Sequence, residues 1–363
     1  GIVGLPGSGR TTVFNAVTRG RADLDAYGGP QEAPNIGVAK VPDGRLALLA
    51  EVFGPKRVVP AEVTYVDLPA APEAAGTART VPGQYLNHLQ TADVLLVVVR
   101  AFDDPSVSHT QGSVDPFRDI DTMVLELALS DVEILDRRLS RLDEGSKGAK
   151  PVEREALSKE RSLLSRLREE LEADNTIRNA SLTQQESRQL EGFQLLTAKP
   201  IIAAVNVGEG QMSEVPALER RLQEALPGDG AGATVICGQL EMELAQMEPE
   251  EERDFRESLG LGESGLDRMI RLSHEVGDLI TFFTGNRNDV RAWTVARGTT
   301  AQKAAGKVHT DFERGFIRAE VVAYDDLADC GSVSEARNRG VLRQEGKGYV
   351  VQGGDVLNIL FSV

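Results

Sequence analysis

The feature that most constrains the fold lies at the start of the chain, where a short apolar stretch runs into a glycine-rich loop. The segment GLPGSGRT, from Gly4 to Thr11, follows the phosphate-binding pattern G-x-x-x-x-G-K-[ST], with Arg10 in place of the lysine. Such glycines allow consecutive backbone N–H groups to face a phosphate at a helix N-terminus. The segment predicts a strand–loop–helix unit that binds a phosphate-bearing ligand. The simpler alternative is a glycine turn that only joins the two elements.

The residues expected to bind a nucleotide in this loop share a position next to the phosphates. They are Gly4, Gly7, Ser8, Gly9, Arg10, Thr11 and Thr12. Thr11 stands where a hydroxyl group binds Mg²⁺ in such loops. Asp67 ends the strand-like stretch VTYVD and is expected to hold the same ion through a water molecule. Thr11 and Asp67 are therefore the predicted metal site, and Mg²⁺ is the predicted cofactor.

Further apolar segments extend the pattern along the chain. Strands are predicted at residues 63–68, 93–99, 199–206 and 233–238. The near-continuous apolarity of 93–99 and 199–206 is typical of a parallel sheet that is covered on both faces. Because these strands alternate with helices, the sequence predicts a doubly wound α/β domain with its ligand at the carboxyl ends of the strands.

Base recognition is expected after the strand at 199–206. Asn206 and Glu209 form N-x-x-E where GTP-binding proteins carry N-K-x-D. An aspartate at the last position accepts hydrogen bonds from the N1–H and amino groups of guanine, so its replacement weakens the case for a strict guanine preference. Cys237 follows a later strand and is expected to pack beside the base.

Two regions depart from the α/β pattern. Between residues 119 and 192, leucines recur at helical spacing on both sides of the loop DEGSKGAKP, which predicts two long helices in an antiparallel hairpin. From 281 to 363, β-rich runs are separated by Gly and Asp, which predicts a small α+β domain. The predicted organisation is an α/β domain over 1–118 and 193–280, the hairpin over 119–192 and the C-terminal domain over 281–363.

Composition excludes some classes of protein. The net charge of −16 argues against non-specific nucleic-acid binding through the whole surface. Residues 281–363 hold 11 Lys/Arg and 10 Asp/Glu, so the C-terminal part repels nucleic acid less than the rest. No apolar run reaches the ~18 residues of a membrane span. Cys237 and Cys330 offer no disulfide framework. No signal peptide is expected, because Gly1 already falls within the first predicted strand.

Several long motifs resemble one family. The stretches GIVGLPGSGRTTVFNAVT, LGLGESGLDRMIR and VRAWTVARGTTAQKAAGKVHTDFERGFIRAEVVAYDD together are similar to the YchF family, the Obg-like ATPases, and the likeness covers nearly the whole chain. The resemblance implies a P-loop NTPase G domain with an inserted coiled-coil hairpin and a C-terminal TGS domain of the ubiquitin-like β-grasp type. It also implies a preference for ATP over GTP, and contact with the ribosome or ribosomal RNA through the TGS and coiled-coil surfaces. The expected form is a cytoplasmic monomer without membrane contact.

The sequence departs from the family pattern at the reacting end of the site. Arg10 replaces the lysine, Gln31 lies where the first switch carries a threonine, and Ala70 replaces a glycine of the second switch. Ala71 takes the place of the catalytic glutamine, which the family already lacks. His109 matches a histidine suggested to assist hydrolysis, and the alternative is a solvated loop histidine without a task.

Two functions remain open at this point. The first is a switch that binds ATP, with GTP as a second ligand, and slowly hydrolyses it to ADP and phosphate in translation or stress. The alternative is a hydrolysis-deficient pseudo-NTPase that acts as a TGS and coiled-coil binding scaffold. A dinucleotide-binding enzyme is disfavoured, because GLPGSG lacks the G-x-G-x-x-G spacing.

Overall fold

The computed structural model describes residues 1–20, 22, 33–68, 86–148, 150–226, 230–259, 261 and 264–362. The chain separates into two compact units. The first is formed by Gly1–Gly37 and Tyr65–Met269, and the second by Val38–Thr64 and Ile270–Val363. None of the described helices is long and apolar enough to span a membrane.

The first sheet has six strands in the order β2-β4-β1-β5-β6-β7. Their bounds are Ile2–Val3 (β1), Asn35–Lys40 (β2), Glu62–Asp67 (β4), Leu95–Arg100 (β5), Ile201–Asn206 (β6) and Ala231–Ile236 (β7). Strand β1 pairs in parallel with β4 and β5, and β6 pairs in parallel with β5 and β7. The predicted doubly wound, mainly parallel sheet is confirmed.

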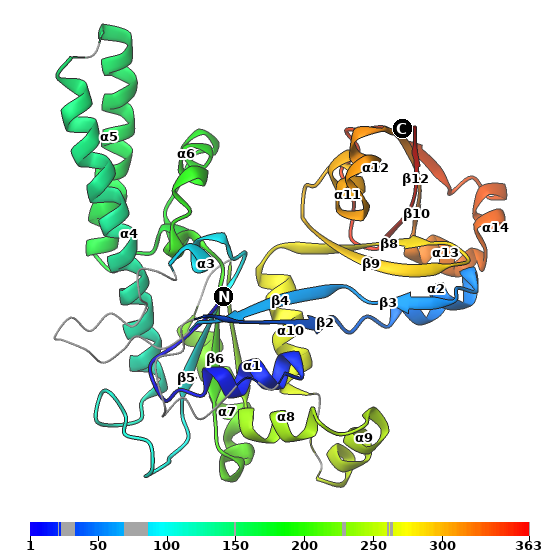
Figure 1. The fold of residues 1–363 in the computed structure, drawn as a ribbon, viewed down its shortest axis with the longest axis horizontal. Coiled ribbons are helices and arrows are strands. Elements are labelled where there is room, and N and C mark those ends of the chain that lie inside the picture. Colours follow the sequence, from blue (N-terminus) through cyan, green and yellow to red (C-terminus); the bar gives the residue numbers. More distant parts are fainter. Residues whose placement is uncertain are drawn as a thin grey trace. The chain divides into compact units, whose positions relative to one another are not determined.

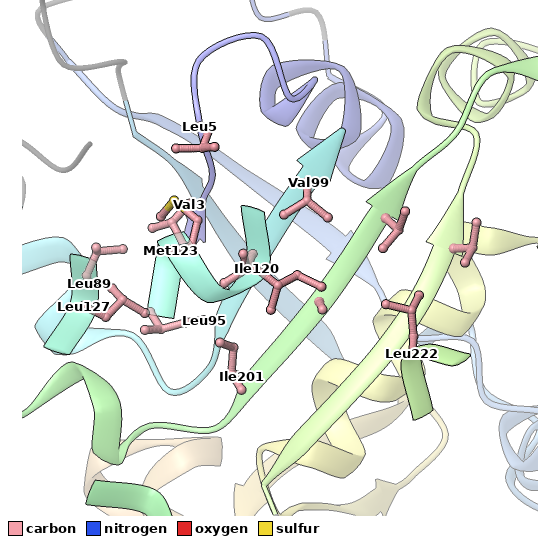
Figure 2. Packing of buried hydrophobic residues seen from close by; sticks show 14 of the residues in the cluster. Val3, Leu5, Leu89, Leu95, Val99, Ile120, Met123, Leu127, Ile201 and Leu222 are labelled. Atoms are coloured by element: carbon pink, nitrogen blue, oxygen red, sulfur yellow. The ribbon is translucent and has the colours of Figure 1, made fainter. Parts of the chain in front are cut away.

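Apolar side chains on both faces explain why this sheet forms. Every residue of β5 and β6 is buried, as their uninterrupted apolar runs predict. Figure 2 shows Val99 of β5 and Ile201 of β6 in one cluster with Ile120 and Met123 from a covering helix and Leu222 from another. The cluster fixes the strand ends that carry the site.

Helices connect and cover these strands. Those of the first unit are Arg10–Thr18 (α1), Leu86–Thr91 (α3), Gln184–Leu190 (α6), Val215–Ala225 (α7), Gly238–Leu244 (α8) and Pro249–Ser258 (α9). Helix α10, Gly265–Val276, begins in the first unit and ends in the second. Short 3₁₀ turns lie at Ile177–Asn179, Glu191–Phe193, Leu196–Ala198 and Glu209–Glu214.

A helical hairpin projects from the α/β unit. Helix α4 runs from Pro116 to Ser146 and α5 from Pro151 to Glu172, and the two lie along each other (Figure 1). Their buried leucines include Leu135, Leu142, Leu164, Leu167 and Leu171. Helix α4 starts a little before the predicted boundary at 119, because the Asp115 side chain accepts the N–H of Arg118 and a proline suits the first turn.

The second sheet has the order β11-β10-β12-β8-β9-β3. Its strands are Arg57–Val59 (β3), Leu279–Gly285 (β8), Asp289–Ala296 (β9), Phe316–Ala323 (β10), Arg343–Glu345 (β11) and Asp355–Phe361 (β12). Its helices are Arg45–Phe53 (α2), Ala301–Val308 (α11), Thr310–Arg314 (α12), Tyr324–Cys330 (α13) and Val333–Asn338 (α14). The last strand, β12, pairs in parallel with β8, and β8 forms an antiparallel hairpin with β9. This arrangement is that of a ubiquitin-like β-grasp fold.

The division into domains differs from the prediction in two places. The α/β domain was expected to run to residue 280, but the first unit ends at Met269. Residues 38–64 were expected within the α/β domain, but they cluster with the C-terminal part. The reason is pairing: β3 lies parallel to β9, with Val58 opposite Val290. In addition, the ring of Phe53 packs so closely on Gly285 that a Cβ atom there would lie 2.5 Å from the ring. Strand β3 has only three residues, too few for an alternation of apolar and polar side chains that would predict its pairing with β9.

Candidate nucleotide-binding site

The loop between β1 and α1 adopts a shape that requires glycine. Gly7 has φ +75° and Gly9 has φ +86°, both in the left-handed region. A Cβ atom on Gly4 would lie 2.2 Å from the carbonyl oxygen of Val98, and one on Gly9 would lie 2.3 Å from Nδ2 of Asn206. The loop is therefore curled tightly against the neighbouring strands, as a phosphate-binding loop must be.

Thr11 meets Asp67 at the start of α1. The hydroxyl of Thr11 donates a 2.8 Å hydrogen bond to Oδ2 of Asp67, and Nδ2 of Asn35 donates to the same oxygen at 3.3 Å. Asp67 is 1% exposed, yet its Oδ1 has no hydrogen-bond partner among the residues that the structure describes. Burial raises the pKa of Asp67, while the positive charge of Arg10 and these two hydrogen bonds oppose the rise.

This arrangement fits a Mg²⁺ ion. A buried carboxylate oxygen without a partner is costly, and a hard cation or its bound water would satisfy it. Within the described ranges, no group of three or more His, Cys, Asp or Glu side chains could hold a metal. An ion at Thr11 and Asp67 would thus take its remaining ligands from water and phosphate oxygens, which is how Mg²⁺ is usually bound in proteins.

Arg10 stands beside the same carboxylate. The negative charge of Asp67 acts on the guanidinium, but burial outweighs it and lowers the pKa of Arg10. Its aliphatic stem lies along the loop, since Cδ is 3.3 Å from the position of a Cβ on Gly4. Ser8 adds a buried hydroxyl that is unpaired in the described part of the chain. Thr12 follows in the first turn of α1.

Asn206 ties the phosphate loop to the segment after β7. Its Nδ2 donates to the carbonyl oxygen of Ser8 at 3.1 Å, and its Oδ1 accepts the N–H of Gly238 at 2.9 Å. The buried Asn206 amide thus connects the phosphate loop to the segment after β7 by hydrogen bonds. Glu209 is exposed at the start of the 3₁₀ turn Glu209–Glu214, so its carboxylate is accessible to a ligand.

Cys237 lies at the junction of β7 and α8. Its side chain is buried in the core cluster together with Val205 and Leu222. Burial is the largest cause that raises the pKa of this thiol. The residue contributes packing to this core, and its neighbour Gly238 supplies the N–H that reaches Asn206.

His109 is held in place on the loop between β5 and α4. Nε2 lies 2.9 Å from Oδ2 of Asp119, and Nδ1 accepts the backbone N–H of Gln111 at 3.1 Å. Because Nδ1 accepts, Nε2 carries the proton and donates to Asp119. The side chain is 7% exposed, so it is not a solvated loop histidine. Gln31, Ala70 and Ala71 lie outside the described residues.

Sequence reasoning missed two residues of the site. Asn35 reaches Asp67, and Arg100 ends β5 beside the phosphate loop. The signal for Arg100 was a charged residue at the end of the apolar run VLLVVVR. For Asn35, at the start of β2, nothing in the neighbouring sequence indicates Asp67 as its partner.

Comparisons with known proteins agree with this geometry. A family model described as "50S ribosome-binding GTPase" matches residues 1–134. A model for a YchF GTPase C-terminal region, described as "Protein of unknown function (DUF933)", matches residues 279–362.

Full-length relatives and a solved structure are similar to this protein over nearly its whole length. The "Ribosome-binding ATPase YchF" of Bacillus subtilis (strain 168) is 40% identical over 365 residues, which is 100% of this chain and 99% of the relative. Its namesake in Escherichia coli O157:H7 is 35% identical over 363 residues, with the same coverage of 100% and 99%. The structure of the Schizosaccharomyces pombe YchF GTPase matches with a TM-score of 0.84 and 31% identity, over 99% of this chain and 96% of that one. A formed phosphate loop, a helical hairpin and a β-grasp unit in this order, together with these relatives, show that the chain belongs to the YchF family.

Proposed function

We propose that this protein binds ATP with Mg²⁺, hydrolyses it slowly to ADP and phosphate, and acts as a switch on the ribosome. The observation that carries the proposal is the contact between Thr11 and Asp67, with an unpaired carboxylate oxygen beside a formed phosphate loop. The relatives named ribosome-binding ATPase support the partner and the reaction.

The phosphate end of the site supports binding by backbone and metal together. The N–H groups at the start of α1 and the helix dipole favour a bound anion. Thr11 and Asp67 would hold the Mg²⁺ ion, which neutralises phosphate charge when bound. Arg10 keeps a positive charge at the lysine position, but its wider planar head reaches phosphate oxygens differently from an ammonium group.

The base end supports ATP, with GTP as a weaker ligand. Asn206 is engaged by Ser8 and Gly238, so we assign the choice of base to Glu209 and its surroundings. The glutamate side chain at this position is one methylene group longer than the aspartate side chain of N-K-x-D proteins. That difference disfavours the close, paired acceptance of the guanine N1–H and amino groups.

Slow hydrolysis follows from the reacting end. His109 donates to Asp119 and is enclosed, so it must leave that contact before it can reach a γ-phosphate. Loss of ~3–4 kcal/mol of transition-state stabilisation would slow turnover by about 10²–10³-fold. The hydrolysis-deficient scaffold is not favoured, because the relatives that cover the whole chain are named ribosome-binding ATPase.

We assign the ribosome contact to two parts of the chain. These are the α4–α5 hairpin and the β-grasp unit from residue 279 onward, where the balance of charge least repels RNA. A ribosomal partner places the protein in the cytoplasm.

Binding of fluorescent ATP and GTP to the purified chain, with and without Mg²⁺, tests the proposal. We expect Mg²⁺-dependent ATP binding that the variant Thr11→Ala weakens. The matched control is Thr91→Ala, which removes a threonine hydroxyl that donates to carbonyl oxygens within α3. If the folded wild-type chain binds neither nucleotide, the ATPase proposal is wrong.

A further inference from the structure

A buried arginine without a role in the proposed chemistry lies next to the phosphate loop. Arg100 is the last residue of β5 and is 3% exposed. A guanidinium group is rarely buried to this extent unless its N–H groups are paired. The partners of Arg100 therefore indicate what the residue does.

Three hydrogen bonds of the Arg100 guanidinium go to the backbone of the segment that follows it. Nε donates to the carbonyl oxygen of Phe102 at 3.0 Å, Nη2 to that of Asp104 at 3.0 Å, and Nη1 to that of Val107 at 2.9 Å. The guanidinium also lies 4.7 Å from the ring centroid of Phe102. A planar group with fixed N–H directions can hold three carbonyl oxygens at once, whereas an ammonium group cannot present the same fork.

The carboxylate of Asp104 does not take over this pairing. Oδ1 of Asp104 accepts hydrogen bonds from the N–H of Ser106 at 2.9 Å and from its hydroxyl at 2.6 Å. Arg100 instead bonds the carbonyl oxygen of Asp104. The arginine thus shapes the segment, and the aspartate closes a turn within it.

The segment that Arg100 holds lies against the phosphate loop. A Cβ atom on Gly7 would lie 2.9 Å from Cγ1 of Val107, 3.8 Å from Nη1 of Arg100 and 4.0 Å from the carbonyl oxygen of Ser108. On Gly9, such an atom would lie 3.9 Å from Cε1 of Phe102. Both left-handed glycines of the loop therefore have neighbours from this segment.

A second anchor fixes the far end of the segment. His109 donates to Asp119, and Arg118 donates to the other oxygen of the same carboxylate at 3.1 and 2.9 Å. This anchor holds the end next to α4. Arg100 holds the part that touches the phosphate loop.

We propose that Arg100 is a positioning residue for the nucleotide phosphates, because its guanidinium holds residues 102–108 against Gly7 and Gly9 and so keeps the phosphate loop curled. The inference rests on the proposed function in that the ligand of this loop is a nucleotide. That Arg100 orders the phosphate loop does not depend on which ligand the loop binds.

The variant Arg100→Lys tests this assignment, because it keeps the charge and removes the fork. Amide hydrogen exchange would be compared between the variant and the wild-type full chain, together with the affinity for fluorescent ATP in Mg²⁺. We expect faster exchange in peptides that cover residues 4–9 and 102–112, unchanged exchange in the α4–α5 hairpin, and ATP binding about tenfold weaker.

Arg178→Lys is the matched control. Arg178 also donates to a backbone carbonyl oxygen, that of Lys199 at 2.8 Å, but Lys199 precedes β6 and lies away from its carboxyl end. We expect the control to leave exchange at residues 4–9 and ATP affinity at wild-type values. Equal exchange at 4–9 and 102–112 in Arg100→Lys and wild type would overturn the inference.

Two further arms keep the outcomes distinct. If the wild-type chain binds no nucleotide, the proposed function fails, while the exchange comparison still decides whether Arg100 orders the loop. If Arg100→Lys does not fold, Val107→Ala removes the side chain that contacts Gly7 and leaves Arg100 in place. Faster exchange at residues 4–9 in this variant supports the inference, and unchanged exchange contradicts it.

Discussion

Single side chains join the two ends of the nucleotide site. Asn206 was expected to take part in nucleotide binding, and its amide bonds Ser8 on the phosphate loop and Gly238 on the segment after β7. A side chain with one donor group and one acceptor suits this bridge, because the two loops offer a carbonyl oxygen and an N–H group. The residue therefore positions both loops, whichever base is bound.

Asn206→Asp should weaken ATP and GTP binding alike. The aspartate keeps an acceptor for the N–H of Gly238 but turns a charged oxygen toward the carbonyl oxygen of Ser8, which drives the loops apart. We expect about a tenfold loss of affinity for each nucleotide, measured by titration of fluorescent analogues. Glu209→Gln is the comparison, since it should change the ratio of the two affinities. Loss of affinity for only one nucleotide in Asn206→Asp would contradict the bridge.

Gly9→Ala should abolish nucleotide binding through the backbone. The residue has φ +86°, and an added Cβ would lie 2.3 Å from Nδ2 of Asn206. The matched control is Gly112→Ala, because Gly112 has φ +78° but open space around its Cβ position. Strain at such a φ costs about 1–3 kcal/mol. Both variants should melt at lower temperature, and only Gly9→Ala should lose ATP binding; retained binding would disprove the steric argument.

At the scale of elements, the local sequence predicts those helices and strands whose apolar residues show which of their faces are buried. The runs at β5 and β6 are apolar throughout, and such runs form strands that are covered on both faces. Leucine spacing likewise predicts α4 and α5, since one apolar face suffices to pair two helices. How the hairpin attaches to the α/β unit has no such local signal, because besides the apolar contacts of Ile120 and Met123 it depends on one buried carboxylate.

That carboxylate is Asp131 of α4. It is fully buried, and it accepts the N–H groups of Leu196 and Thr197, each at 2.8 Å, and the hydroxyl of Thr197 at 2.6 Å. Burial is the largest cause that raises its pKa from 3.8 to about 6, and the hydrogen bonds act against the rise. The carboxylate fixes the hairpin to the segment before β6.

The raised pKa predicts a pH dependence of unfolding. Because the folded state binds the proton more tightly than the unfolded state, this contribution to stability is complete below pH 3.8 and is lost as pH rises through about 6. Relative to Asp131→Asn, the wild type should therefore gain up to about 3 kcal/mol in free energy of unfolding between pH 7 and pH 4. Denaturant unfolding at each pH measures it. Asp121→Asn, at an exposed position of the same helix, is the control. A difference that does not vary with pH would contradict the shift.

At the scale of the whole molecule, the chain crosses between its two units. The chain leaves the first unit after Gly37 and returns to it at Tyr65. The residues between, 38–64, belong to the second unit and add β3 to the edge of its sheet. The packing of Phe53 on Gly285 belongs to that second unit. The single tryptophan of the chain, Trp293, lies in β9 and therefore reports on the second unit alone.

Phe53→Ala should destabilise the second unit selectively. Loss of the ring from Gly285 removes about 1–3 kcal/mol of apolar burial. We expect the unfolding transition followed by Trp293 fluorescence to move to lower denaturant concentration, while ATP binding by the first unit stays at the wild-type value. Phe255→Ala, an exposed aromatic residue of α9, should not move the Trp293 transition. If the Phe53 variant leaves that transition unchanged, residues 38–64 do not stabilise the second unit.

The sequence by itself determined the phosphate loop, the buried strands and the helical hairpin, because each depends on spacing between near neighbours in the chain. Glycines at Gly4, Gly7 and Gly9 and the Thr11 hydroxyl are readable in that way. Tertiary structure alone decided that Asn206 bridges two loops, that Arg100 holds a segment against the phosphate loop, and that residues 38–64 join the C-terminal unit. These depend on hydrogen bonds and packing between segments that only the folded chain brings together, and no local pattern records the partner of a polar side chain.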